Sequence, residues 1–176
     1  MIRGIGWTIA ASTLLLGACG DDDPSRPDEP DLTRADVAGQ YEMTELAFDP
    51  QGSLTEVDLL ERLDGANLPD FIVASNEDSL QLVFRDPDGG LVRTVPGSYE
   101  LADRWIDVDL ANAVEPAKLL LPREIRLTFD SIAGTLSFEG TIQADTTRLF
   151  VLVPEWSGEP VTNPLPGLLT VTFTRD

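Results

Sequence analysis

The sequence predicts an all-β fold, a closed barrel or a sandwich, in residues 32–176. From residue 68 onward, apolar and polar side chains alternate with period two, the pattern of a strand with one buried face. Turn-forming residues interrupt this alternation at the spacing of hairpins, most clearly at residues 86–90, which read DPDGG. Eight or nine short strands joined in this way are typical of antiparallel barrels and sandwiches.

The first segment of this domain is expected to be a short helical turn. Thr33 and Asp36 have the spacing of a capping box, and Gly39 follows as a stop signal. Residues 40–48 then form the first strand. Its apolar positions slip by one residue near residues 44–45, which predicts a bulge or bend there.

A helix is expected after the first strand. Ser53 and Glu56 form a second capping box. Val57, Leu60 and Leu63 follow at a spacing of three, which places them on one helical face. The pattern therefore predicts a helix that ends at about Leu63 and buries that face.

The alternation of apolar and polar residues predicts eight further strands. Residues 111–122 are expected to be irregular, and residues 154–167 to form a loop with four prolines. The strands are expected at residues 68–73, 80–85, 91–101, 105–110, 125–129, 136–142, 148–153 and 169–174.

Composition excludes several classes of function. The 176 residues include 31 acidic and 12 basic side chains, for a formal net charge of −19. Such a charge repels phosphate backbones, so no nucleic-acid partner is expected. The chain has no histidine and one cysteine. Catalytic triads with a histidine base, histidine-ligated zinc and intrachain disulfides are therefore not available.

The N-terminus has the features of a bacterial lipoprotein signal. Residues 5–16 are mainly apolar, but a permanent membrane span needs about 20 residues. The tetrapeptide at residues 16–19, Leu-Gly-Ala-Cys, resembles the bacterial lipobox. This resemblance implies a cleaved signal peptide in residues 1–18 and lipid attachment at Cys19. The alternatives are a general signal peptide and an uncleaved anchor.

The lipobox also implies a location in the cell envelope, where the N-terminal lipid holds the protein on a membrane. In bacterial lipoproteins an aspartate after the lipidated cysteine favours the inner membrane. Here that residue is Gly20, which implies the outer membrane, facing the periplasm, in an organism with two membranes. Residues 19–31 hold three prolines and six acidic residues and are expected to be an acidic disordered tether.

The start of the domain resembles the lipocalin-like, or calycin, group. The sequence at residues 37–41 reads Val-Ala-Gly-Gln-Tyr, and the first strand of that group opens with glycine, any residue, then tryptophan. Tyr41 stands in the place of that tryptophan. The resemblance implies an antiparallel up-and-down barrel of eight to nine strands, with Tyr41 buried near the closed end. The chain departs from the group by ending on a strand and by placing a helix after strand one.

A lipocalin-like barrel implies candidates for an apolar ligand site. The 14-residue loop around Trp156 has the length of a lid or binding segment, but the favoured role for Trp156 is to plug the barrel mouth or to pack on an outer face without a ligand. Apolar interior side chains could line a cavity or fill it, because an eight-stranded barrel is just wide enough for either. The candidates for ligand lining or a lid are Tyr41, Leu82, Phe84, Phe129, Phe138 and Trp156.

Candidate chemistry is weaker. Asp107 and Asp109 lie on one face of a strand, about 7 Å apart, a separation that a glycosidase could use, but we expect them on its solvent side. Asp86 and Asp88 resemble the start of a calcium-binding loop, but Gly97 stands where such a loop has a bidentate glutamate. A hairpin turn is therefore expected. Lys118 is expected at the surface. No metal, cofactor or catalytic residue is predicted.

Three classes of function are left by these observations. The first is a lipid-anchored envelope lipoprotein that binds a small apolar ligand in its barrel. The second, ranked nearly level with it, is a ligand-free structural or protein-interaction module of the envelope. An enzyme is the third and is not expected, because the sequence offers no converging set of polar groups.

Overall fold

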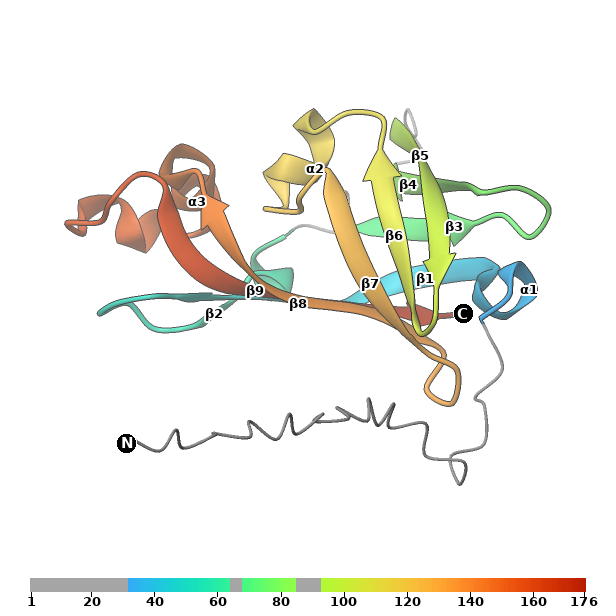
Figure 1. The fold of residues 1–176 in the computed structure, drawn as a ribbon. Coiled ribbons are helices and arrows are strands. Elements are labelled where there is room, and N and C mark those ends of the chain that lie inside the picture. The colour runs from blue at the N-terminus through green and yellow to red at the C-terminus, as the bar shows by residue number, and fades with distance from the viewer. Residues whose placement is uncertain (1–31, 64–67, 85–92) are drawn as a thin grey trace, which may run out of the picture. The chain divides into compact units, whose positions relative to one another are not determined.

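Nine strands dominate the computed structural model of this chain, which describes residues 32–63, 68–84 and 93–176 (Figure 1). All of these residues belong to one compact unit, Asp31–Asp176. The strands are β1 (Gly39–Pro50), β2 (Val57–Asp58), β3 (Pro69–Val73), β4 (Ser79–Phe84), β5 (Arg93–Ala102), β6 (Trp105–Leu110), β7 (Glu124–Asp130), β8 (Thr135–Ala144) and β9 (Leu165–Arg175).

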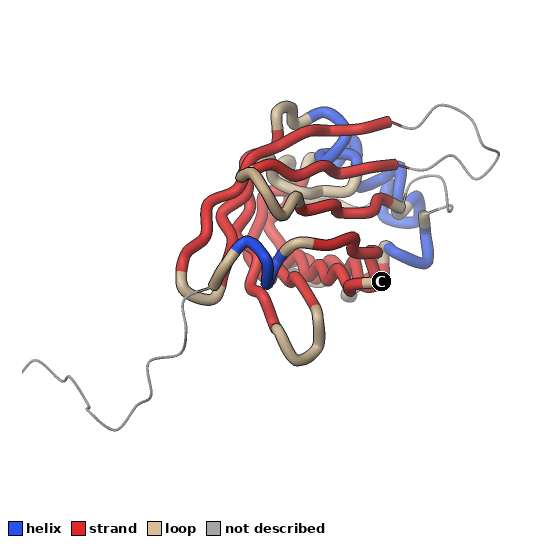
Figure 2. The backbone as a smooth tube through the Cα atoms, turned by 90° about the vertical axis from the view of Figure 1, so that its right-hand side faces the viewer, coloured by secondary structure: helices blue, strands red, loops and turns tan. Residues whose placement is uncertain are grey.

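The strands form an antiparallel up-and-down barrel, as the sequence predicts. Their order is β2-β1-β3-β4-β5-β6-β7-β8-β9, and β1 also pairs with β9. Strands β1 and β3 to β9 thus close an eight-stranded barrel, with β2 as an extra strand on the edge of β1. Figure 2 shows the strands as the wall of this barrel and the helices as short segments between them.

The helices are short. In the described ranges, three are α-helical and two are 3-10 turns. They are α1 (Arg34–Val37), η1 (Leu60–Arg62), α2 (Val114–Lys118), α3 (Thr146–Leu152) and η3 (Pro154–Gly158).

Two predictions for the start of the domain are confirmed. The Asp36 carboxylate accepts hydrogen bonds from the amide and the hydroxyl of Thr33, at 2.9 and 2.6 Å, which completes the capping box of α1. The pairing of β1 with β9 shifts register between Met43 and Glu45. This irregularity lies where the apolar positions of the strand slip, because one extra residue changes which face the next side chain occupies.

The helix expected after β1 is confined to the single turn η1. Residues 57–58 form β2 instead, with Val57 opposite Phe48 of β1. The amides of Leu60 and Glu61 bond to the side chain of Asp58, at 2.8 and 3.3 Å, and so cap η1 where the sequence predicts a continuous helix. Pairing with β1 takes the backbone groups that a longer helix would have used.

The strand predicted at residues 148–153 is wrong, because this segment belongs to α3. The side chain of Asp145 accepts a hydrogen bond from the Thr147 amide at 2.9 Å and caps the helix. Leu149 and Val153, four residues apart, are both buried, which is the spacing of a helical face. The following proline-rich segment contains η3, and β9 begins at Leu165, inside the predicted loop.

Leucines after α2 close one part of the barrel core. The irregular segment expected at residues 111–122 holds α2 and then Leu119, Leu120 and Leu121, which are all buried in the main apolar cluster. Sequence analysis did not assign these residues to the core, since they follow neither strand nor helix spacing. Three consecutive leucines in a connecting segment were the available signal.

Three strands run past the rest of the barrel. β8 pairs with β9 over ten positions, whereas it pairs with β7 over three. β1 pairs with β9 from Tyr41 to Pro50. The sheet of β1, β8 and β9 therefore continues beyond the end of β7, and α3 lies at its far end (Figure 1).

The extended sheet requires a glycine at residue 167. A Cβ atom there would lie 2.3 Å from Cζ of Phe48 and 2.8 Å from the backbone oxygen of Asp49. Phe48 is fully buried, so its ring has little room to move. We expect Gly167→Ala to lower the free energy of unfolding by about 1–3 kcal/mol through overpacking, measured by urea denaturation. Gly158→Ala is the control, because no heavy atom lies within 4 Å of its Cβ position; equal midpoints for the two variants would contradict the packing.

Candidate functional site

The six predicted ligand-lining residues do not meet at one cavity. Tyr41, Leu82, Phe84, Phe129 and Trp156 are buried, and Phe138 is partly buried against the same apolar cluster. Of the six, Leu82 lines a small apolar cavity, together with Phe71, Leu127 and Phe173 among others. The volume of that cavity is about 10 Å³, the space of roughly one water molecule.

Tyr41 and Phe129 lie together at one end of the barrel, under Arg175. The guanidinium carbon of Arg175 is 5.1 Å from the centre of the Tyr41 ring and 5.5 Å from that of Phe129, within cation–π range. Arg175 Nη2 donates to the Tyr41 hydroxyl at 2.6 Å and to the backbone oxygen of Asp36. The cation thus joins β1, β7 and β9 to α1.

The Tyr41 hydroxyl completes this contact by donating to the backbone oxygen of Val37 at 2.7 Å. Burial raises the pKa of Tyr41, so the phenol keeps its proton at neutral pH. Val37 is the last residue of α1. Tyr41 is therefore buried against the N-terminal helical turn.

Phe84 and Trp156 lie in other parts of the protein. The guanidinium of Arg93 covers the ring of Phe84, 5.1 Å from its centre. Trp156 belongs to η3, which packs against α3. Its side chain is 7% exposed, and the neighbouring Glu155 forms an ion pair with Arg62 at 2.7 Å. Trp156 is thus buried in the apolar cluster, and the residue before it is held by an ion pair.

Phe138 lies along its own strand. A Cβ atom at Gly140 would fall 2.6 Å from Cζ of the Phe138 ring. The ring therefore covers the backbone of β8 two residues further on, and the glycine provides the space for it.

The paired carboxylates Asp107 and Asp109 face solvent and bind arginines. Arg126 donates to both oxygens of Asp107, at 2.6 and 2.7 Å. Arg123 donates to both oxygens of Asp109, at 2.9 and 3.3 Å. The hydrogen bond from Arg126 holds the pKa of Asp107 below its ordinary value. This carboxyl is therefore ionised at neutral pH and has no proton to donate as a general acid.

A groove separates α2 from α3 on the surface. Its volume is about 410 Å³, and its lining includes Ala117, Leu120, Leu121, Ile142, Ala144 and Arg148. This lining comes from three elements that are distant in sequence: α2 with the leucines after it, the end of β8, and α3. No motif in the sequence indicated the groove, since its walls depend on how the barrel closes.

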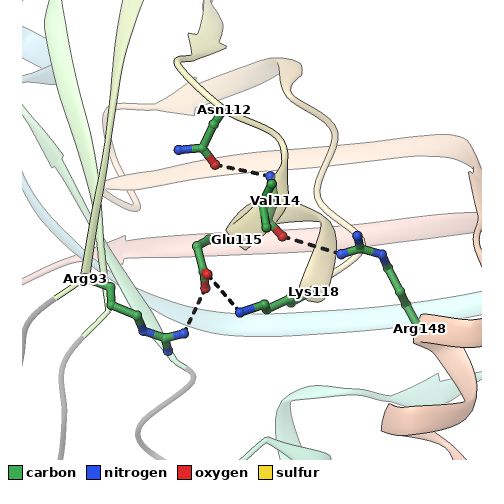
Figure 3. Close-up of polar contacts among 6 residues, drawn as sticks. All are labelled: Arg93, Asn112, Val114, Glu115, Lys118 and Arg148. Atoms are coloured by element: carbon green, nitrogen blue, oxygen red, sulfur yellow. Dashed lines mark hydrogen bonds and ion pairs between the residues drawn. The ribbon is translucent and has the colours of Figure 1, made fainter.

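Polar contacts fix α2 at the edge of this groove (Figure 3). The Glu115 carboxylate accepts from Arg93 of β5 and from Lys118, each at 2.8 Å. The Val114 amide donates to the Asn112 side chain at 3.1 Å. Arg148 of α3 reaches across and donates to the backbone oxygen of Val114 at 3.4 Å. Lys118 thus lies at the surface, as expected, but in an ion pair.

Several sequence predictions fall outside the described residues: the lipobox with Cys19, the tether at residues 19–31 and the turn with Asp86 and Asp88. Among the described residues, no group of three or more acidic, cysteine or histidine side chains has the arrangement of a metal site. In the same ranges, no helix has the length and apolar character needed to cross a bilayer.

The contact between Tyr41 and Arg175 should contribute substantially to stability. We expect Tyr41→Ala to cost about 3–5 kcal/mol of unfolding free energy, as other large aromatic truncations do. Tyr41→Phe keeps the ring under Arg175 but leaves the Val37 oxygen without its donor, and should cost about 1–3 kcal/mol. Thermal and urea denaturation measure both. A melting temperature for Tyr41→Ala within about one degree of wild type would contradict a stabilising role for buried Tyr41.

Comparison with known proteins yields no relative that assigns this chain to a family: no family model matches it, and no curated protein matches it significantly.

Proposed function

We propose that this protein is a lipid-anchored lipoprotein of the bacterial cell envelope that acts through the surface of its barrel. On this proposal the domain is a ligand-free structural or protein-interaction module. The single observation that carries the choice is that apolar side chains fill the part of the interior that the structure describes. The cavity beside Leu82 has a volume of about 10 Å³, whereas sites for small apolar ligands occupy roughly 300–1,000 Å³.

Binding of a small apolar ligand inside the barrel is the weaker proposal. It would require several core side chains to leave their positions, because the candidate lining residues belong to one packed apolar cluster. Displacing even one large apolar side chain from a packed core costs several kcal/mol, typically about 2–5. The resemblance to lipocalin-like proteins is supported by the barrel topology and by the burial of Tyr41, and neither feature needs a ligand.

The envelope location rests on the lipobox. Residues 16–19 place a cysteine directly after two small residues, at the end of a short apolar run. The 13 residues from Cys19 to Asp31 would reach up to about 45 Å when fully extended. A tether of that length lets the domain work clear of the lipid headgroups. Gly20 favours the outer membrane, facing the periplasm, where the organism has two membranes.

Lipid attachment is tested by metabolic labelling with palmitate. Wild-type protein should incorporate the label, and Cys19→Ala should not, because the chain holds no other cysteine. Two or three acyl chains on one residue would hold the protein on the membrane without a basic patch. Label that persists in Cys19→Ala would overturn the anchor.

The filled interior is tested with a fluorescent fatty acid. The wild-type protein should show no saturable binding of this probe. Trp156→Ala should lower the unfolding free energy by about 3–5 kcal/mol, as expected for a buried tryptophan. Val151→Ala, an exposed change in the neighbouring helix, should stay within about 0.5 kcal/mol of wild type. Tight probe binding by the wild type, with loss of binding but not of stability in Trp156→Ala, would favour the lid and the apolar ligand.

A further inference from the structure

Half of β8 has a free backbone edge. On one side β8 pairs with β9 along its whole length, from Thr135 to Ala144. On the other side it pairs with β7 only from Thr135 to Ser137. Figure 1 shows the two strands diverging beyond that point, with β7 running toward α2 and β8 toward α3.

The alternation of ladder bonds identifies the free groups. The Arg175 amide donates to the backbone oxygen of Gly134 at 2.8 Å. Because residues of an antiparallel strand point their N–H and C=O groups to alternate sides, the even-numbered residues of β8 bond to β9. Glu139, Thr141 and Gln143 therefore direct theirs away from β9. On that side, these backbone groups make no hydrogen bond with a described residue.

The groove between α2 and α3 lies against this edge. Thr141 and Gln143 belong to its lining, together with the apolar side chains of Leu120, Leu121 and Ile142. A strand that paired with β8 would point every second side chain to one face of the sheet. The side chains of the incoming strand that point to the groove would contact its apolar lining.

Exposed apolar side chains flank the same groove. Val114 is 60% and Val151 77% exposed, and only Ile132 joins them as an exposed large hydrophobic among the described residues. Val114 precedes Ala117 by three residues on α2, and Arg148 precedes Val151 by three on α3, so each pair shares a helical face. Since Ala117 and Arg148 line the groove, both valines lie on the faces that border it.

Two carboxylates without an ion pair to any described side chain lie on the strands that border the gap. Glu124 of β7 and Glu139 of β8 are exposed, and neither forms an ion pair with another described side chain. Residues 32–176 as a whole carry ten basic and 25 acidic side chains, or −15. Basic side chains on an incoming strand would therefore be attracted, while a second copy of this chain would be repelled.

We propose that the free edge of β8 binds an extended segment of a partner protein by strand addition, and that this segment alternates apolar with basic residues. Its backbone pairs with Glu139, Thr141 and Gln143, its apolar side chains contact the groove, and its basic side chains face Glu124 and Glu139. The inference rests on the proposed function, because it assigns the partner to a barrel that works through its surface.

The contact that crosses the groove is weak enough to open for this partner strand. Arg148 bridges α2 and α3 through a hydrogen bond of 3.4 Å to the Val114 oxygen (Figure 3), which is near the upper limit for such bonds. Arg148 also lies 3.8 Å from Asp145. The side chain can therefore leave Val114 for that carboxylate, and the groove can widen without breaking a strong contact.

The test is a titration of the mature lipoprotein, in detergent micelles, with a fluorescein-labelled peptide of four Lys-Val repeats, followed by fluorescence anisotropy. We expect saturable binding. Two control peptides separate backbone pairing from charge. The same sequence N-methylated at every residue keeps the charge but loses all of its backbone donors, and a Glu-Val peptide reverses the charge. Both should bind at least about tenfold more weakly. Equal binding of the N-methylated peptide would overturn strand addition.

Variants of the protein locate the site. Thr141→Pro removes an N–H from the free edge, where proline is tolerated in a strand, and should weaken binding about tenfold or more. Thr141→Val keeps the N–H and should bind like wild type. Glu139→Lys together with Glu124→Lys should reverse the preference between the two charged peptides. Unchanged peptide affinity in Thr141→Pro, with an unchanged melting temperature, would overturn the proposal. Self-association of the protein that the peptide competes with would also overturn it, because the edge would then bind a second copy of this chain.

The peptide titration can fail without refuting the proposed function, which the fatty-acid experiment tests separately. If the lipoprotein fails to bind the Lys-Val peptide but also binds no fatty acid, the strand-addition site is refuted and the ligand-free barrel stands. If it binds the fatty acid, the proposed function fails whatever the peptide does.

Discussion

The antiparallel pairing of β1 with β9 is the constraint on which the rest of this structure depends. It joins the first and last strands and so closes the barrel. Arg175 reinforces the closure at one end, since its guanidinium lies over rings from β1 and β7 and bonds to α1. On its other edge, β1 pairs with β3 before the irregularity between Met43 and Glu45 and with β2 after it. One strand thereby serves both the barrel and the extended sheet.

The free edge of β8 follows from the same closure. A fully closed barrel has no strand edge, and this property protects such folds from unwanted pairing. Here β8 and β9 are ten and eleven residues long, whereas β7 has seven and pairs with β8 through three. Long strands can pair with each other but leave β8 unpaired where β7 turns away. The helices at the far end, α3 and η3, cover the core of the extended sheet and leave that backbone edge open.

The sequence predicted those features that depend on local spacing. Period-two alternation placed most of the strands, the phase slip in β1 placed its irregularity, and Thr33 with Asp36 placed α1. Prediction failed where tertiary pairing or capping decided between two local patterns: Val57 pairs with Phe48, and Asp145 starts α3 in a segment of strand-like composition. The burial of Leu82, Phe129 and Trp156 could be expected from hydrophobicity. The sequence could not predict that these three residues lie apart, nor the groove beside β8, because both depend on strand register and on where β7 ends.

Net charge gives the free edge its selectivity. The cationic side chains of the domain are largely used in ion pairs with its own carboxylates: Arg34–Asp78, Arg62–Glu155, Arg93–Glu115, Lys118–Glu115, Arg123–Asp109, Arg126–Asp107 and Arg148–Asp145. Carboxylates outnumber these cations, so the excess is left at the surface, with Glu139 beside the open backbone of β8. Exposed edges are a risk for self-association, and charged side chains are one way in which proteins reduce it. An acidic edge on an acidic domain discourages pairing between copies of this chain, while a basic strand is attracted by the same negative charge. The same net charge that predicts no nucleic-acid partner therefore favours basic, extended segments as partners of this edge.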